Sequence, residues 1–330
     1  MQLVCEVHDG TQVGAARRQA RQVAVAAALN EVMTEHASIV ATELASNLWK
    51  HAGGGCLFIQ HISDESFEGV ELLAVDRGPG IPDIGRSLQD GHSTSGTPGT
   101  GLGAAHRLSS VFDVHSETGK GTVVVSRIGR QRTPGAPLPQ WGAVMTSAPG
   151  EPVCGDQWII ALSEGSVLTT MVVDGLGHGV LAHDVAQHAV RTFTAAQHEQ
   201  PGVLLHRLHA ALSGERGAAV AIARADLGSG TVTYAGAGNV AGTIVQADGR
   251  QLGMVSMNGT VGADHISVRE FQYPWHPGDV LVMHTDGIRS HWSLGERAGL
   301  LRRHPAVISA VLHRDFLRGR DDATVVALTR

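Results

Sequence analysis

The chain has 330 residues, of which 42% are hydrophobic and 17% charged, and its formal net charge is -6. This balance is typical of folded globular domains and excludes a disordered chain, and the acidic charge disfavours nucleic acid as a partner. No apolar run reaches the roughly 18 residues of a membrane span, so we expect no membrane partner. The first residues lack a basic region followed by an apolar stretch, and the three cysteines form no CxxC pair, so a cytoplasmic protein is predicted.

The length predicts two domains, each large enough to bury its own core. Their boundary is predicted at residues 130–140, RQRTPGAPLPQ, where three prolines and a glycine interrupt both helical and strand patterns. The first domain then covers residues 1–129 and the second covers residues 141–330. The 42 glycines, roughly twice the usual share, predict many turns and glycine loops.

The first domain is predicted to begin with two helices, at residues 11–30 and 35–51. Two strand-like segments follow, CLFIQHIS and VELLAVD, and then a long glycine-rich loop. A helix from about Leu102 leads into VFDVHSE and GTVVVSRI, which predict a closing hairpin around residues 117–121. This order predicts an α/β domain with helices on one face of a mixed sheet.

The second domain is predicted to begin with a hairpin, WIIALSEG followed by VLTTMVVDG. Helices at residues 178–197 and 203–212 come next. The remaining strand candidates are AAVAIARAD, TVTYAGAG, AGTIVQAD, SVREFQY, DVLVMHTDG and ATVVALTR. A strand-rich domain with few helices favours two packed sheets with the helices outside. The whole chain is therefore of the α/β (α+β) class.

A polar face on the second predicted helix is the first candidate site. In ATELASNLWKHA, Glu43 and Asn47 are four residues apart, so they project from the same face of the helix, and Lys50 lies near the same side. A core helix would be apolar at these positions. Taken alone, such a pair is usually a solvated face.

Glycines form the second part of this site. The segment DRGPGIPD places Asp76 at the end of a strand, followed by glycines at which the backbone can approach a flat ligand closely. The segment GHSTSGTPGTGLG places further glycines just before a helix, where backbone N–H groups can be offered to phosphates. The glycines concerned are Gly78, Gly80, Gly99, Gly101 and Gly103. Either loop alone is usually a turn, but the ordered combination predicts a nucleotide site.

This combination, over about residues 10–128 and with DGHSTSGTPGTGLG followed by SETGKGTVV, resembles the GHKL ATPase superfamily. It is most similar to the RsbT-like serine kinases of bacterial partner-switching systems, the anti-sigma-factor kinase type. The resemblance implies a Bergerat α/β sandwich that binds ATP and Mg²⁺. Nothing upstream is long enough for the phosphoacceptor domain of a histidine kinase, so His36, His51 and His61 are interpreted as ordinary histidines.

The resemblance also implies roles for individual residues. Glu43 would act as general base on the acceptor hydroxyl, and Asn47 would hold Mg²⁺ on the triphosphate. Asp76 would receive the adenine amino group, with Thr122 near the adenine. The other cofactor-binding residues would be Lys50, Gly78, Gly80, Gly99, Gly101 and Gly103. Phosphoryl transfer chiefly requires positioning, a metal and neutralised charge, and these residue types agree with that chemistry.

The second domain contains aspartates where apolar strands begin or end. They occur in GDQW, VVDGLGHG, HTDGI and RDDATVV, as Asp156, Asp174, Asp286, Asp321 and Asp322. A single Asp-Gly pair is usually a turn, but four acidic strand edges in one domain can form an oxygen-rich pocket. Such a pocket suits Mg²⁺ or Mn²⁺ and disfavours zinc or copper. Two such ions can activate water for attack on phosphorus.

These motifs in this order, over about residues 141–330, resemble the SpoIIE-type metal-dependent serine/threonine phosphatases, and AGAGNV and NGTVG are similar to the RsbX branch. The resemblance implies a four-layer αββα sandwich with two divalent ions, either Mg²⁺ or Mn²⁺. By matching positions, Asp174 would bridge both metals and the Gly175 carbonyl would ligate one of them. The site would be completed by Asp156, Asp286 and Asp321, with Asp322 as the weaker candidate.

Two departures from the phosphatase pattern concern neighbouring residues. Thr285 stands where a serine is usual, and His178 lies two residues further from Asp174 than the histidine proposed as an acid in eukaryotic relatives. We therefore assign His178 no catalytic role. The helical histidines lack an obvious set of partner carboxylates, which disfavours a zinc site among His183, His188, His206 and His209.

The leading hypothesis is a bifunctional regulator of a partner-switching stress pathway. Its N-terminal domain would phosphorylate a serine or threonine on a STAS-domain antagonist, and its C-terminal domain would dephosphorylate that protein or a related one. The alternative keeps the phosphatase and makes the first domain a nucleotide-sensing or docking module without kinase turnover. A third reading, a non-catalytic scaffold for a sigma-factor regulator, is disfavoured because all the expected metal aspartates are present.

Overall fold

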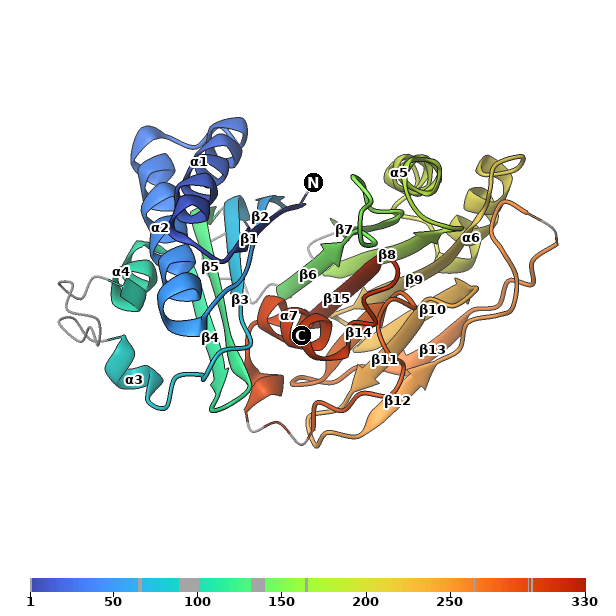
Figure 1. Ribbon diagram of the computed structural model, residues 1–330. Helices are drawn as coiled ribbons and strands as arrows, with labels where there is room; N and C mark the ends of the chain where they lie inside the picture. The colour runs from blue at the N-terminus through green and yellow to red at the C-terminus, as the bar shows by residue number, and fades with distance from the viewer. Residues whose placement is uncertain are drawn as a thin grey trace. The chain divides into compact units, whose positions relative to one another are not determined.

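The computed structural model of the chain describes residues 2–64, 67–88, 101–131, 140–163, 166–263, 265–295, 297 and 299–330. The chain divides into two compact units, Met1–Ala136 and Pro137–Arg330 (Figure 1). Strands β5 (Gly121–Gln131) and β6 (Gln140–Thr146) flank the predicted linker. The ends of that predicted segment therefore belong to strands, and its residues 132–139 lie outside the described residues.

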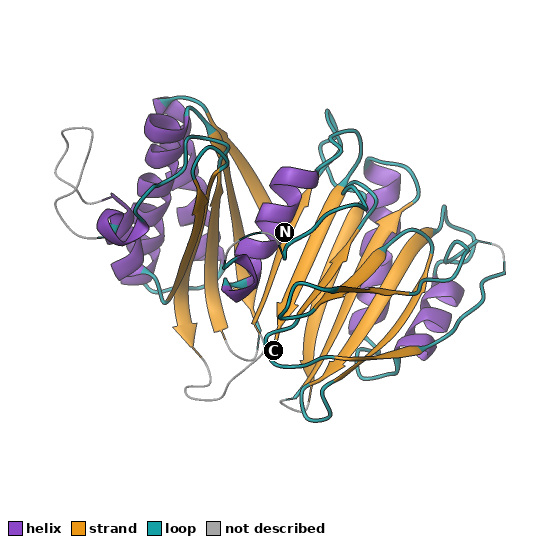
Figure 2. Cartoon of the chain, turned by 90° about the horizontal axis from the view of Figure 1, so that it is seen from below, coloured by secondary structure: helices purple, strands orange, loops and turns teal. Residues whose placement is uncertain are grey.

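The first unit is a five-stranded sheet with helices on one face (Figure 2). The strand order is β1-β2-β3-β5-β4, with β1 at Gln2–Val7, β2 at Gly55–Ser63, β3 at Phe67–Val75 and β4 at Val111–Glu117. Every described strand pair in this sheet is antiparallel, so the prediction of a mixed sheet was wrong. The reason is the position of β5: it lies between β3 and β4 and is antiparallel to both, so the two strands joined by the glycine-rich connection are not neighbours in the sheet.

The two long helices begin at side-chain caps. Helix α1 (Gly10–Ala26) begins at the N-cap Asp9, and α2 (Glu31–Ala52) begins at the N-cap Asn30. The first predicted helix was therefore too long at its C-terminal end, because Asn30 already accepts a hydrogen bond from the first turn of the next helix. Helix α2 ends at Gly53, whose φ of 75° is in the left-handed region that glycine adopts without strain.

Alanines allow these helices to pack closely on each other and on the sheet. Buried alanines recur every four residues on each helix: Ala16, Ala20 and Ala24 on α1, and Ala37, Ala41 and Ala45 on α2. Larger side chains of α2, such as Leu44 and Leu48, join the sheet residues in the same core. The short helices α3 (Ile84–Ser87) and α4 (Gly101–Leu108) follow, and α4 lies against α2.

Within its described residues, the second unit has two five-stranded antiparallel sheets and three α-helices, which Figure 1 shows. One sheet has the order β13-β10-β9-β8-β7 and the other has the order β12-β11-β14-β15-β6. Their strands are β7 (Asp156–Ser163), β8 (Val167–Gly175), β9 (Ala218–Asp226), β10 (Thr231–Ala237), β11 (Ala241–Val245), β12 (Gln251–Met254), β13 (Phe271–Pro274), β14 (Val280–His284) and β15 (Ala323–Thr329).

Helices cover the outer faces of these sheets. Helices α5 (Val180–Thr194) and α6 (Pro201–Ala211) lie on the first sheet, and α7 (Pro305–Phe316) lies on β6 and β15 of the second. A short 3-10 helix at Leu300–Arg302 precedes α7. The four layers are thus helix, sheet, sheet and helix, as the resemblance to the phosphatases implied.

Sequence patterns missed α7 as well as strands β1, β6 and β12. All ten residues from Pro305 to Arg314 are buried, so α7 has no polar face and shows no helical period. Its N-terminal signals are local ones, a proline in the first turn and the His304 side chain accepting the Ala306 N–H at 3.2 Å. In the described part of the chain, no helix is both long and apolar enough to cross a membrane.

The contact between α7 and β6 can be tested at Gly142. A Cβ at this position would lie 2.1 Å from backbone atoms of Ala306. We expect Gly142→Ala to lower the free energy of unfolding by about 1–3 kcal/mol, because a backbone contact cannot give way as a flexible side chain can. Gly253→Ala on β12 is the matched control, since no atom lies within 4 Å of a Cβ there. Equal stability of the two variants in chemical denaturation would contradict this packing.

Candidate active sites

The first candidate site begins on the polar face of α2. Glu43 and Asn47 are half-buried, one turn apart, and the neighbouring Leu48 is buried in the core. Lys50 is exposed, with Nζ 5.9 Å from the centroid of the Trp49 ring. The helix therefore holds a carboxylate and an amide at the edge of the core, where they are fixed by packing yet can reach a ligand.

Asp76 follows β3 directly and is held by backbone groups. Its Oδ1 accepts the Gly78 N–H at 2.8 Å and the Thr122 N–H at 3.1 Å. Its own N–H donates to the Thr122 carbonyl at 3.0 Å. These bonds fix the carboxylate between the loop after β3 and the start of β5, as a residue that reads a flat base requires.

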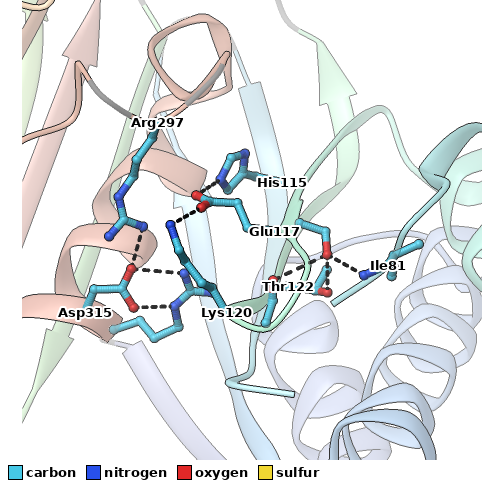
Figure 3. Close-up of polar contacts among 10 residues, drawn as sticks. Ile81, His115, Glu117, Lys120, Thr122, Arg297 and Asp315 are labelled. Atoms are coloured by element: carbon cyan, nitrogen blue, oxygen red, sulfur yellow. Dashed lines mark hydrogen bonds and ion pairs between the residues drawn. The ribbon is translucent and has the colours of Figure 1, made fainter. Parts of the chain in front are cut away.

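The hydroxyl of Thr122 joins a second set of contacts (Figure 3). Thr122 Oγ1 lies 2.8 Å from Ser116 Oγ, and Ser116 Oγ accepts the Ile81 N–H at 2.7 Å. Gly80 has a φ of 75°, and a Cβ there would lie 2.4 Å from the Glu117 carbonyl oxygen. The loop after β3 is thus fastened to the β4–β5 hairpin at a point where only glycine fits.

Gly78 brings the same loop to the end of α2. A Cβ on Gly78 would lie 2.7 Å from Ala52 Cα. Gly101 begins α4 and Gly103 is buried within it, whereas the predicted phosphate-loop residue Gly99 lies outside the described residues. Since α4 also contacts α2, three of the predicted parts of the nucleotide site gather around one helix. The roles of these residues stay predictions.

The start of α4 offers a clean test of nucleotide binding. Among the described residues, no atom lies within 4 Å of a Cβ at Gly101, so Gly101→Val is expected to leave the fold intact. Because backbone N–H groups hold phosphates only at close approach, we expect this variant to weaken ATP binding by about tenfold or more. Calorimetric titration with Mg²⁺-ATP measures it, and unchanged thermal unfolding serves as the folding control. The same affinity in variant and parent would show that ATP does not approach this helix.

The second candidate site lies where β7 begins and β8 ends. Asp156 and Asp174 are directly opposite each other in the β7–β8 register. Asp156 is 1% exposed, and its Oδ2 accepts the Thr285 hydroxyl at 2.7 Å. Opposed residues of adjacent antiparallel strands have Cβ atoms only about 5 Å apart, so the two carboxylates repel each other.

Burial and mutual repulsion raise the pKa of both carboxyl groups. Burial is the largest cause for Asp174, followed by the charges of Asp286, Asp321 and Asp322, and together they raise its pKa to about 7. Burial, and then the charge of Asp174, raises the pKa of Asp156 well above its usual value. The structure therefore brings the other four predicted aspartates within electrostatic range of Asp174.

Two polar residues that the sequence analysis gave no role hold these aspartates. Asn239 Nδ2 donates to Asp286 Oδ2 at 2.7 Å. The Thr285 hydroxyl, which donates to Asp156, also accepts the Thr324 N–H at 3.0 Å and so connects Asp156 with β15. Asn239 lies in the AGAGNV motif, just after β10, and this position is the only sequence signal for its place in the site. A threonine hydroxyl makes the contact that the usual serine would be expected to make.

The neighbouring acids Asp321 and Asp322 differ in their surroundings. Asp322 is buried, and its two oxygens accept the N–H groups of Ala148 at 2.8 Å and Gly155 at 2.9 Å. Asp321 is exposed, and its Oδ1 accepts the Asp322 N–H at 2.9 Å. Asp322 therefore ties the segment before β7 to β15, whereas Asp321 faces outward and is the better candidate for a ligand.

Two features of the aspartate cluster suit a divalent cation: its negative charge and one buried carboxylate oxygen whose hydrogen bonding is unsatisfied among the described residues. Asp156 Oδ1 is buried and accepts no hydrogen bond within the described part of the structure, so a cation would replace its lost hydration. Across the residues described, no three His, Cys, Asp or Glu side chains form a ready ligand set for one ion. Mg²⁺ usually keeps several waters and takes only one or two carboxylates, so this spacing agrees with hydrated ions bound at the edge of the two sheets.

Glycines let the surrounding backbone close on this cluster. A Cβ on Gly175 would lie 2.4 Å from the Ala182 carbonyl oxygen in α5, and the Gly175 N–H donates to the Gly155 carbonyl at 3.2 Å. The Gly175 carbonyl is thereby held at the end of β8, next to Asp174. This is the place that a carbonyl ligand would need to occupy.

Four histidines of this unit, three of them from the helical cluster, have separate partners. His178 Nδ1 lies 2.5 Å from Glu151 Oε1, and His188 Nδ1 lies 2.7 Å from Glu215 Oε1. His183 Nδ1 lies 2.8 Å from the Cys154 carbonyl oxygen, and His209 Nδ1 accepts the Gly262 N–H at 3.1 Å. Each ring is thus engaged by a different part of the chain.

Comparison with known proteins gives two family matches. Residues 8–128 match the histidine kinase-like ATPase domain, and residues 164–330 match stage II sporulation protein E (SpoIIE). The chain is 38% identical over 110 residues to the serine/threonine-protein kinase RsbT of Bacillus subtilis (strain 168), covering 33% of this chain and 83% of the relative. It is 24% identical over 152 residues to the phosphoserine phosphatase RsbX of the same organism, covering 44% of this chain and 76% of the relative.

Among solved structures, RsbX in complex with magnesium aligns with a TM-score of 0.51 and 18% identity, covering 66% of this chain and 99% of that chain. This likeness shows the phosphatase fold. The two units are therefore a kinase-like ATPase domain and a SpoIIE-type domain with the fold of the RsbX phosphatase. The chain belongs to the SpoIIE family through its C-terminal part, and its N-terminal part is an RsbT-related member of the histidine kinase-like ATPases.

The raised pKa values predict how pH and metal affect stability. Between the ordinary carboxyl pKa of 3.8 and the value of about 7 for Asp174, the folded state holds a proton that the unfolded chain has released. The metal-free protein should therefore lose stability as pH rises through this window. Mn²⁺ should relieve the repulsion, so its addition should raise the Tm more at about pH 8 than at about pH 5.

Thermal unfolding with and without Mn²⁺ measures this difference. Asp174→Asn should lose most of the metal response, whereas Asp184→Asn is the matched control, because Asp184 is an exposed aspartate on α5. An equal rise in Tm at both pH values would contradict the assignment of the cation to these carboxylates.

Proposed function

We propose that the chain is a bifunctional regulator of a partner-switching pathway. Its first domain would transfer the γ-phosphoryl group of ATP to a serine or threonine of a STAS-domain protein. Its second domain would hydrolyse phosphoserine or phosphothreonine on that protein or a related one. The observation that carries the phosphatase half is the pair Asp156 and Asp174, which are opposed in the β7–β8 register, together with the buried Asp156 oxygen that no described donor satisfies.

In the phosphatase domain, the carboxylates would hold two divalent ions, which supply an activated water and neutralise phosphoryl charge. Asp174 would face both ions, with Asp156, Asp286, Asp321 and the Gly175 carbonyl completing the site. Asn239 and Thr285 would fix the orientations of Asp286 and Asp156 through the hydrogen bonds described above. Asp322 would keep the segment before β7 against β15, so that Asp156 stays in register with Asp174.

In the kinase-like domain, Glu43 would take the proton of the acceptor hydroxyl as its oxygen bonds to the γ-phosphorus and the bond to ADP breaks. Asn47, one turn further along α2, would hold Mg²⁺ through its amide oxygen. Asp76 would recognise the adenine amino group, and its two backbone hydrogen bonds would keep its carboxylate in place. The RsbT relative, a serine/threonine-protein kinase, supports this assignment.

A set of matched variants tests the kinase half. Because the attached phosphatase would remove the product, all variants carry Asp286→Asn, and each is incubated with labelled ATP and STAS-domain proteins from the same genome. Glu43→Ala should bind ATP but lower phosphoryl transfer by about a hundredfold or more, since general bases contribute that much. Asn47→Ala should lose Mg²⁺-dependent ATP binding as well.

Glu35→Ala is the control, because it removes a half-exposed carboxylate, paired with Arg21, from an earlier turn of the same helix. If the parent binds ATP and labels none of the STAS proteins, the kinase assignment fails and the domain is a nucleotide sensor. The phosphatase half is measured separately, by release of phosphate from a phosphoserine protein in Mn²⁺. That half fails if Asp174→Asn retains the activity of the parent.

A further inference from the structure

Three exposed apolar side chains follow the proposed metal ligand Asp174 within seven residues. Leu176 is 46% exposed, and Val180 and Leu181 are each 57% exposed. They lie where β8 leads into the first turn of α5 (Figure 1). We call these three residues the apolar rim.

The fold does not require apolar residues at these positions. The face of α5 that packs on the sheet consists of Ala182, Val185, Ala186, Ala189 and Phe193. Val180 and Leu181 precede this stripe and are among the most exposed large hydrophobic residues described. Apolar side chains that are exposed next to a reaction centre mark a surface for binding.

A positive charge lies beside the same segment. A Cβ on Gly177 would lie 3.1 Å from Nη1 of Arg216, whose side chain is exposed. The Leu176 N–H donates to the Gly217 carbonyl at 3.0 Å, which keeps the segment carrying Arg216 alongside the rim. The nearby acid Glu151 is engaged by His178.

The geometry points to a docking site for the substrate protein: we propose that the apolar rim and Arg216 bind the residues that flank the phosphorylated serine or threonine. The occupant is thus an extended segment with apolar residues beside a phosphoryl group. The rim touches apolar flanks, and the guanidinium complements the phosphoryl charge as the phosphate enters the metal site. This inference rests on the proposed phosphatase function and specifies which substrates that site accepts.

Two phosphoserine peptides test the proposal, one with leucine and one with serine on both sides of the phosphoserine. With Mn²⁺, the parent should hydrolyse the leucine peptide with a kcat/KM about tenfold higher, mainly through a lower KM, because partial burial of a leucine contributes on that order. Val180→Glu and Leu181→Glu should reduce this preference to about one. Glutamate is tolerated structurally at these positions, since the first turn of α5 has no acidic residue and a helix N-terminus favours one.

Val203→Glu is the matched control, because Val203 is 52% exposed in the first turn of α6. It should keep the preference of the parent. Hydrolysis of p-nitrophenyl phosphate, which has no flanking residues, reports on the metal site itself and should change less than about twofold in every variant. If the glutamate variants lose activity on p-nitrophenyl phosphate, the peptide preference is measured instead in Val180→Ser and Leu181→Ser, because serine introduces no charge.

A preference that survives in the rim variants, or a parent that hydrolyses both peptides equally well, overturns the docking site and leaves the phosphatase assignment standing. A parent that hydrolyses neither peptide nor p-nitrophenyl phosphate overturns the proposed function and the docking site together. Sedimentation velocity provides the remaining arm: if the rim variants abolish self-association of the parent and keep the peptide preference, the rim binds a second copy of the chain and the proposal is wrong.

Discussion

The repulsion between Asp156 and Asp174 is the constraint on which the rest of the phosphatase unit depends. The β7–β8 register places the two carboxylates opposite each other, and the burial of Asp156 limits the water that could screen them. Such a pair is costly in the absence of a cation and becomes favourable once one is bound. Two hydrogen bonds keep the pair in place. Asp322 accepts the N–H of Gly155, the residue before Asp156, and the Thr285 hydroxyl donates to Asp156 itself.

The kinase-like unit uses a different means of positioning. Its proposed base and metal-binding amide lie on one continuous helix, and the loop after β3 is attached to that helix and to the β4–β5 hairpin through glycines. Hydrogen bonds from backbone N–H groups orient Asp76, so no opposing charge is needed to fix it. In the phosphatase unit, carboxylates that repel each other are held close together, and a bound cation would reduce that repulsion. The kinase-like unit instead positions its residues through close backbone contacts.

The SpoIIE match begins at residue 164, after Asp156 in the chain. What connects Asp156 to the site is its register opposite Asp174, which belongs to the matched region. Asn239 and Asp286 are also far apart in the sequence, and the fold brings them together in a hydrogen bond of 2.7 Å. The site is therefore assembled from strand edges, and the apolar rim lies beside it because the chain passes directly from Asp174 into α5.

The sequence by itself determined the class of each unit, the helical face of Glu43 and Asn47, and the aspartates at the ends of strands, because these features are periodic or local. Tertiary structure decided the antiparallel first sheet, since β5 lies between β3 and β4 and pairs antiparallel with both. It also decided the existence of α7, whose residues are buried on every side and so carry no period. The partners of the aspartates could not be read from the sequence either, because Asn239, Thr285 and Gly155 reach them only once the two sheets have packed face to face.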